Sequence, residues 1–181
     1  MNLFRKRAPP ANNPRAAPAL PKAAVCFPTP AMTRRAADWL GDLGGCQPIG
    51  ILSDDCGDVV WQCDAEQADL LLLATDFSDG AEDPKDISSR CDIAIEVRRR
   101  RPECRVYLVC EDSHPEKLPA LEQAAELNLI DGYCIGELTA QQARVWLREA
   151  AETMNLAGKP AAATIFGKEG NQTCDNGNKN G

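Results

Sequence analysis

Carboxylates are the side chains of this sequence best suited to chemistry, because a converging pair can hold a divalent cation and a single one can accept a phosphoryl group. Asp54 and Asp55 follow one apolar run, and Asp76 lies two residues beyond another. Adjacent side chains on a turn rarely converge on one ion, so helix capping is the favoured role of Asp54 and Asp55. Residues 76–80 are typical turn formers, which favours a loop role for Asp76.

The single histidine and the nine cysteines form no catalytic or zinc-binding pattern. His114 lies in Ser113-His114-Pro115, where the sequence predicts the entrance of a helix, so we expect it to belong to the cap and loop. The cysteines are odd in number and include no C-x-x-C pair. They are predicted to be reduced, buried thiols that pack as small apolar side chains. We expect no metal ion, no cofactor and no catalytic residue.

Charge is distributed unevenly along the 181 residues. Residues 1–22 contain five basic residues and no acidic one, whereas residues 23–157 contain 12 basic and 25 acidic residues, a net charge of −13. An acidic body repels phosphates, so nucleic acid is an unlikely partner unless the N-terminal arm alone binds it. No apolar run approaches the roughly 20 residues of a membrane-spanning helix. Pro, Asn and Ala follow the basic start in place of an apolar signal stretch, so a cytoplasmic location is expected.

The composition divides the chain into three parts. Residues 1–22 are predicted to be a basic, Pro- and Ala-rich disordered arm, because five prolines interrupt residues 8–22 and few side chains there can be buried. Residues 157–181 become rich in Gly, Asn and Lys and are predicted to be a flexible tail. Residues 23–156 remain for one folded domain.

Within that domain, short apolar runs alternate with segments of helical periodicity, which is the pattern of a parallel sheet covered by crossover helices. Thr29 is a predicted N-cap with Pro30 in the first turn, and Thr139 with Gln142 forms a predicted capping box. The predicted strands are residues 23–27, 48–52, 69–74, 105–110 and 132–135, and the predicted helices are residues 30–43, 55–67, 85–101, one that follows 113–116, and one from 139 onward.

Two segments carry a resemblance to a known family. Residues 95–109, IEVRRRRPECRVYLV, and residues 124–134, AAELNLIDGYC, resemble the third helix to fourth strand and the entry to the fifth strand of response-regulator receiver domains. The resemblance covers residues 23–154. It implies a flavodoxin-like, CheY-like (βα)5 fold, a three-layer αβα architecture with a parallel five-stranded sheet in the order 2-1-3-4-5.

The same resemblance identifies positions at which a working receiver carries its phosphorylation chemistry. A receiver needs an acidic pair after strand one, an aspartate at the end of strand three, a hydroxyl after strand four and a lysine after strand five. Those positions hold other residues in this chain: Pro28 and Thr29, Ala74, Cys110 and Gly136. The expectation is a degenerate pseudo-receiver, and Asp76 is the alternative phosphoacceptor if the loop is displaced.

Receivers commonly pair through the fourth helix, fifth strand and fifth helix, here residues 115–154. The resemblance therefore implies a signalling module that binds a protein partner, a second copy of itself, or both, without catalysis of its own. The residues predicted for that surface are Leu121, Tyr133, Glu137, Gln141, Arg144 and Arg148.

Four alternatives stay open at this stage. A true phosphorelay receiver would use Asp76. Residues 164–173 resemble faintly the opening of the ATPase domain that follows the receiver in tight-adherence pilus localisation ATPases, so the chain could be a truncated or stand-alone relative without ATP hydrolysis. A flavodoxin-like enzyme or nucleotide binder would need more free N–H groups than residues 28–30 offer. A DNA-binding regulator would depend on residues 1–22.

Overall fold

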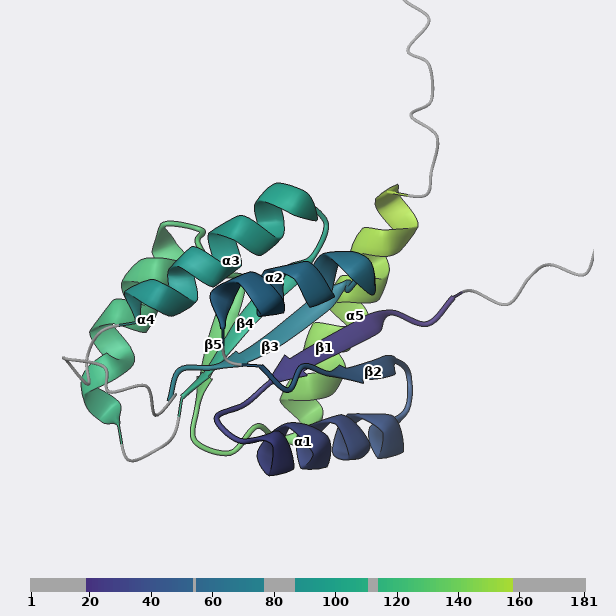
Figure 1. Cartoon of the computed structure of the whole chain (residues 1–181), viewed down its shortest axis with the longest axis horizontal. Coiled ribbons are helices and arrows are strands. Elements are labelled where there is room, and N and C mark those ends of the chain that lie inside the picture. The colour runs from purple at the N-terminus through teal and green to yellow at the C-terminus, as the bar shows by residue number, and fades with distance from the viewer. Residues whose placement is uncertain (1–18, 54, 77–86, 111–113, 158–181) are drawn as a thin grey trace, which may run out of the picture.

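The computed structural model describes residues 19–53, 55–76, 87–110 and 114–157, and these form one αβ unit (Figure 1). Strands and helices alternate throughout, as the sequence pattern predicts. Their bounds are β1 (Lys22–Cys26), α1 (Pro30–Leu43), β2 (Gln47–Gly50), α2 (Cys56–Ala65), β3 (Leu70–Ala74), α3 (Ser88–Arg100), β4 (Arg105–Cys110), the 3₁₀ turn η1 (Pro115–Lys117), α4 (Leu118–Glu126), β5 (Gly132–Ile135) and α5 (Ala140–Ala157).

The five strands form one parallel sheet in the order β2-β1-β3-β4-β5, which confirms the predicted topology. β1 pairs with both β2 and β3, and β4 joins β3 to β5. The chain therefore reverses its direction of winding between β1 and β3. In open α/β sheets, ligands and reacting groups lie beyond the carboxyl ends of the strands at such a switch point.

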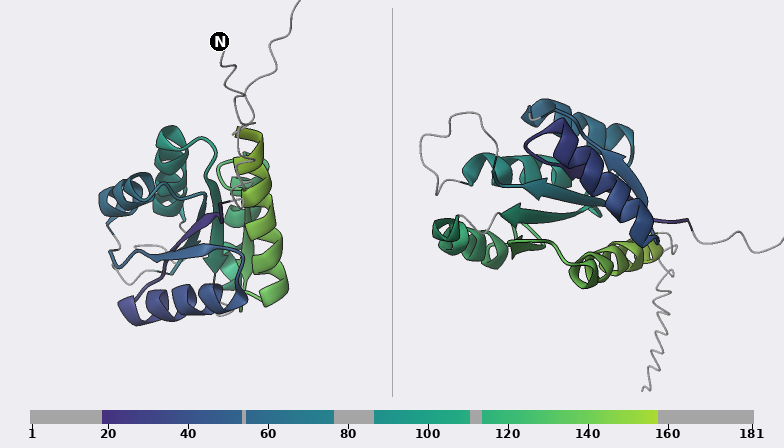
Figure 2. Two further views of the ribbon diagram at one scale, coloured as in Figure 1. Left: turned by 90° about the vertical axis from the view of Figure 1, so that its right-hand side faces the viewer. Right: turned by 90° about the horizontal axis from the view of Figure 1, so that it is seen from below.

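The sheet is buried on both faces because successive strand residues point to opposite sides. Leu71 and Leu73 of β3 pack into a cluster with α2, α3 and α4, whereas Leu70 and Leu72 pack into a second cluster with α1 and α5. The left panel of Figure 2 shows α5 on one side of the sheet and α2 with α3 on the other. The result is the three-layer architecture that the sequence predicts.

Local hydrogen bonds set the starts of three helices. The hydroxyl of Thr29 accepts a hydrogen bond from the Met32 N–H at 3.2 Å, and Asp55 accepts one from the Asp58 N–H at 3.1 Å. The hydroxyl of Thr139 accepts from the Gln142 N–H at 3.3 Å, and the Gln142 side chain accepts from the Thr139 N–H at 3.2 Å. These bonds confirm the cap roles predicted for Thr29, Asp55 and the Thr139–Gln142 box.

Other local predictions differ from the structure. α3 begins at Ser88, so its predicted first turn at Lys85 lies outside the described residues. His114 is the N-cap residue of η1, as predicted, although its side chain makes no cap bond and its Nδ1 lies 3.0 Å from Glu116 Oε1. Seven of the described cysteines are buried free thiols, but Cys56 is exposed in the first turn of α2. The predicted arm and tail fall largely on residues 1–18 and 158–181, which lie outside the description.

No helix among the described residues is both long and apolar enough to cross a bilayer.

Candidate functional site

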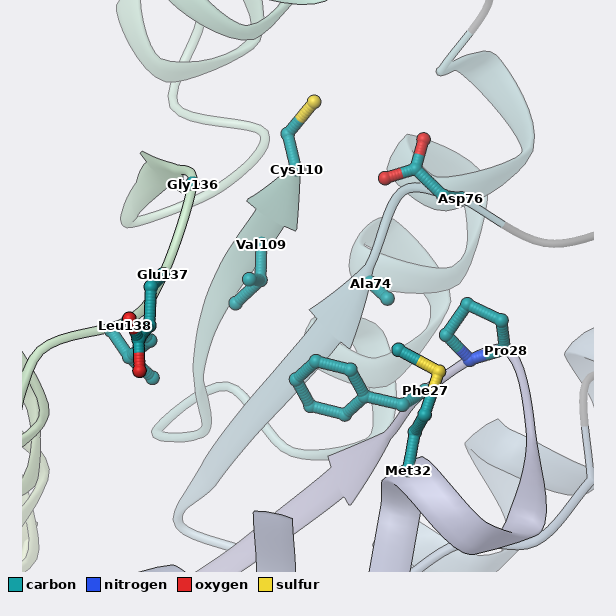
Figure 3. A pocket seen from close by; sticks show the side chains of 10 residues that line it. All are labelled: Phe27, Pro28, Met32, Ala74, Asp76, Val109, Cys110, Gly136, Glu137 and Leu138. Atoms are coloured by element: carbon teal, nitrogen blue, oxygen red, sulfur yellow. The ribbon is translucent and has the colours of Figure 1, made fainter. Parts of the chain in front are cut away.

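A pocket of about 340 Å³ opens at the carboxyl edge of the sheet (Figure 3). It lies at the switch point between β1 and β3, because the loops that leave β1, β3 and β5 surround it together with the end of β4. Its walls are mostly apolar, and they are formed by Phe27, Pro28, Met32, Ala74, Asp76, Val109, Cys110, Gly136, Glu137 and Leu138.

The structure brings four of the five predicted degenerate positions together around this pocket. Pro28, Ala74, Cys110 and Gly136 all line it. Thr29 does not, because its hydroxyl is engaged as the N-cap of α1. Ala74 ends β3 and is only 3% exposed, and a methyl group cannot accept a phosphoryl group.

Asp76, two residues beyond Ala74, is one of two described carboxylates that line the pocket, and Glu137 is the other. Its Oδ1 forms an ion pair with Nζ of Lys117, and its Oδ2 accepts a hydrogen bond from the Thr75 hydroxyl at 3.1 Å. Nε2 of His114 lies 3.9 Å from Oδ1. The side chain of Asp76 is 14% exposed and that of Lys117 only 7%, so the two charges compensate each other largely away from water.

Lys117 is the functional side chain that the sequence analysis missed. It comes from η1, which follows β4, whereas Asp76 follows the neighbouring strand β3. The sequence around it, Pro-Glu-Lys-Leu-Pro, contains charged residues and breaks a helix, which favours an exposed loop. The only hint of this role in the sequence is that Pro115 and Pro119 favour a short first helical turn around Lys117. Lys117 gives this edge of the sheet a buried cation after β4, whereas a receiver has its lysine after β5.

Cys110 occupies the position of the receiver hydroxyl and is fully buried. Burial raises the pKa of its thiol above the ordinary value, so the sulfur stays protonated at neutral pH. The Sγ–H points to the His114 carbonyl oxygen at 3.7 Å. A neutral thiol engaged in this way supplies no positive charge to a phosphoryl group.

A working receiver holds Mg²⁺ at this edge of the sheet, and a cation site there requires carboxylate oxygens. Within the described ranges, no group of three or more His, Cys, Asp and Glu side chains is arranged to hold a metal ion. Asp55 is occupied as the N-cap of α2, and Asp54 lies outside the described residues.

The predicted interaction face is only partly accessible. Glu137, Gln141, Arg144 and Arg148 are exposed and Tyr133 is half-buried. Leu121 is fully buried in the core below α4, and this corrects its predicted place on the surface. The physical reason is helix geometry, because Leu121 and Ala124 are three residues apart on the stripe of α4 that faces the sheet.

A second polar cluster lies at the opposite, amino edge of the sheet, around Asp131. One carboxylate oxygen accepts from Arg105 Nη1 at 2.6 Å, and the other accepts from the Val106 N–H at 2.8 Å and from Arg98. Burial raises the pKa of Asp131, but these hydrogen bonds and the positive charge of Arg98 outweigh it and hold the pKa below its ordinary value. The cluster joins α3, β4 and the start of β5, so we assign it a structural role.

No protein-family model matches this sequence, and no curated protein matches it either. Solved structures do match. A response regulator receiver domain protein from Clostridium thermocellum superposes with a TM-score of 0.57 at 15% identity, covering 76% of this chain and 99% of that one. The REC domain of AraT, a response regulator from Geobacillus stearothermophilus, gives 0.55 at 13% identity, covering 77% and 99%.

A third structure, assigned to pilus assembly (cpaE) in Burkholderia thailandensis, superposes with a TM-score of 0.54 at 16% identity, covering 74% of this chain and 99% of that one. At such low identities the likeness establishes the fold. The described chain therefore has the fold of response-regulator receiver domains, as the two sequence segments predicted.

Proposed function

We propose that this chain is a pseudo-receiver, a regulatory module that binds another protein without being phosphorylated and without catalysis of its own. One observation carries the proposal: the residue at the acceptor position is Ala74, and Asp76, the described carboxylate that follows β3, is paired with the buried ammonium group of Lys117. Phosphoryl transfer to a receiver depends on an acidic acceptor and on a cation held beside it. The eight cysteines in the described part of the chain form no disulfide, which suits a reducing compartment such as the cytoplasm.

Incubation with acetyl phosphate and Mg²⁺ tests this proposal directly. We expect the intact mass of the full chain to stay unchanged, because the acceptor position at the end of β3 is an alanine and Asp76, the described carboxylate that follows it, is paired with Lys117. A working receiver treated in parallel controls for the phosphodonor. A mass gain of one phosphoryl group would contradict the proposal.

The second candidate is a receiver with Asp76 as a displaced acceptor, and the contact with Lys117 is what favours it. A cation beside a carboxylate can stabilise the charge on a phosphoryl group. The variant Asp76→Asn separates the two functions: if wild type gains a phosphoryl group and Asp76→Asn does not, Asp76 is the acceptor. Labelling that persists in Asp76→Asn would locate the acceptor elsewhere in the chain.

Similarity to a protein assigned to pilus assembly supports a narrower form of the proposal, in which this chain is a stand-alone or truncated relative of a pilus-localisation ATPase. The residues that suggested an ATPase opening, 164–173, lie outside the described part of the chain. They contain no G-K-[ST] step, so we infer no ATP hydrolysis from them.

For the partner surface we propose the face formed by α4, β5 and α5. If copies of the chain pair there, reversing Arg144 and Arg148 together to Glu should lower the weight-average mass in sedimentation experiments, because like-charge contacts across an interface are unfavourable. Arg99→Glu on α3 is the matched control, since its side chain is 79% exposed and α3 packs on the face of the sheet opposite to α5. A wild type that stays monomeric at all concentrations would remove self-pairing and leave a different protein as the partner.

A further inference from the structure

The outer face of α2 carries the most exposed tryptophan of the described chain. Trp61 is 63% exposed. Its neighbours one turn away are Gly57 and Ala65, which are too small to cover an indole ring. Asp58 and Asp64 stand three residues before and after it, so both carboxylates share its side of the helix. An uncovered aromatic face between two carboxylates is suited to a guanidinium or ammonium group.

The negatively charged surface extends beyond the part of α2 that carries Trp61. Residues 51–68 include four exposed described carboxylates and no lysine or arginine, namely Asp55, Asp58, Asp64 and Glu66. Burial raises the pKa of the Cys56 thiol, and the negative charges of Asp55, Asp92 and Glu96 raise it further, against the opposing charge of Arg90. Two carboxylates of α3, those of Asp92 and Glu96, therefore lie near the start of α2.

The N-terminal arm leaves the domain beside this surface. Lys22, the first residue of β1, donates from Nζ to the Glu66 carbonyl oxygen at 2.8 Å, just after the last turn of α2. Figure 1 shows the end of α2 and the start of β1 on the same side of the domain. Residues 1–18 precede that point, and their charged side chains are all basic: Arg5, Lys6, Arg7 and Arg15.

We propose that the basic arm, residues 1–18, docks along the outer face of α2 of the same molecule, with Arg15 against the indole ring of Trp61. Two features support residues 1–18 as the segment that binds this face: their charge is complementary to it, and they are covalently attached beside it. The arm contains only basic charges, whereas the exposed surface of α2 contains only acidic ones, and the tether at Lys22 keeps the local concentration of the arm high.

The chain length fits this path. Seven residues separate Arg15 from Lys22, and in an extended, proline-rich conformation they span about 22 Å at roughly 3.1 Å per residue. Trp61 lies five residues before Glu66 on α2, which is about 8 Å along the helix axis at 1.5 Å per residue. Arg15 therefore reaches Trp61 with slack for the turn out of β1. The acidic start of α2 is about 9 Å further along the helix, well within the reach of Arg5, Lys6 and Arg7, which precede Arg15 by eight to ten residues.

The indole N–H signals of the full-length, ¹⁵N-labelled protein test the proposal. The chain has three tryptophans, so three signals are expected, and Trp61→Phe assigns one of them. We expect Arg15→Glu, and separately the triple reversal of Arg5, Lys6 and Arg7 to Glu, to shift the Trp61 signal. Removal of residues 1–18 should shift it furthest, and 0.5 M NaCl should shift wild type in the same direction, because salt screens exposed ion pairs.

Two controls make the result decisive. Arg34→Glu on α1 changes the same charge on the side of the sheet away from α2 and should leave the Trp61 signal in place, and the signals of Trp39 and Trp146 should not follow the arm variants. Dilution distinguishes the source of the arm, since docking within one molecule is independent of protein concentration. An unmoved Trp61 signal after removal of residues 1–18 would overturn the proposal, and a shift that disappears on dilution would overturn docking within one molecule.

Discussion

Replacing Lys117 with Met should lower the free energy of unfolding by about 3 kcal/mol, because it leaves the carboxylate of Asp76 with little access to water and without its cation. Methionine is similar in length and lacks the charge, so the loss reports the ion pair rather than a cavity. The side chain of Lys117 is 7% exposed and that of Asp76 14%. Urea denaturation followed by circular dichroism measures the difference.

The double variant Lys117→Met with Asp76→Asn isolates the interaction between the two side chains. Its loss of stability should be clearly smaller than the sum of the two single losses, since neither charge is then left alone. Arg100→Met is a matched control, because Arg100 pairs with Glu96 on the exposed side of α3 and such pairs contribute about 0.5 kcal/mol or less. If Lys117→Met were as stable as Arg100→Met, Asp76 and Lys117 would not be a buried pair in solution.

The second large effect is expected at Asp131. Asp131→Ala should lower the free energy of unfolding at pH 7 by about 2–3 kcal/mol, because it removes charge-assisted hydrogen bonds and leaves the Val106 N–H without an acceptor. Two guanidinium groups, those of Arg98 and Arg105, lose their shared partner at the same time. Asp38→Ala, at an exposed position on α1, is the control and should change stability by no more than about 0.5 kcal/mol.

The cost of Asp131→Ala should also depend on pH. Hydrogen bonds and the Arg98 charge hold the pKa of Asp131 in the folded chain below its value in the unfolded chain, which is about 3.9. The ionised carboxylate therefore stabilises the fold fully above that value, and its contribution is lost as the pH falls through the lower, folded-state pKa. The stability difference between wild type and Asp131→Ala should shrink below about pH 4. A difference that stayed constant from pH 7 to pH 3 would contradict the lowered pKa.

Local signals explain why so much of the fold could be predicted from the sequence. The cap at Thr29 and the box at Thr139 and Gln142 involve residues three apart, so their chemistry is visible in the sequence itself. The strands are short apolar runs between polar turns, and their alternation with helices favours one parallel topology. Once the order of the strands was predicted, the residues that end neighbouring strands could be predicted to lie together around one site.

Lys117 and Asp131 could not be predicted in the same way. Asp76 and Lys117 are 41 residues apart, and Asp131 and Arg98 are 33 apart, so no local spacing joins the partners. Both are charged residues next to turns, and such residues are usually exposed. The prediction that Leu121 lies on the surface was wrong for a different reason. A binding surface is predicted for whole elements, whereas the burial of each residue depends on the side of α4 on which it lies.

The outer edge strand β2 constrains how copies of this protein can associate. The N–H groups of Gln47 and Ile51 donate inward to Pro21 and Val25, so the intervening residue Pro48 has its nitrogen on the outward side. Proline has no amide hydrogen, and β2 is only four residues long. A strand of another molecule that approached β2 would therefore meet few hydrogen-bond donors. This disfavours sheets that continue from one molecule to the next, and with them the growth of fibres. Association is then left to the helical surfaces and to the other edge strand, β5.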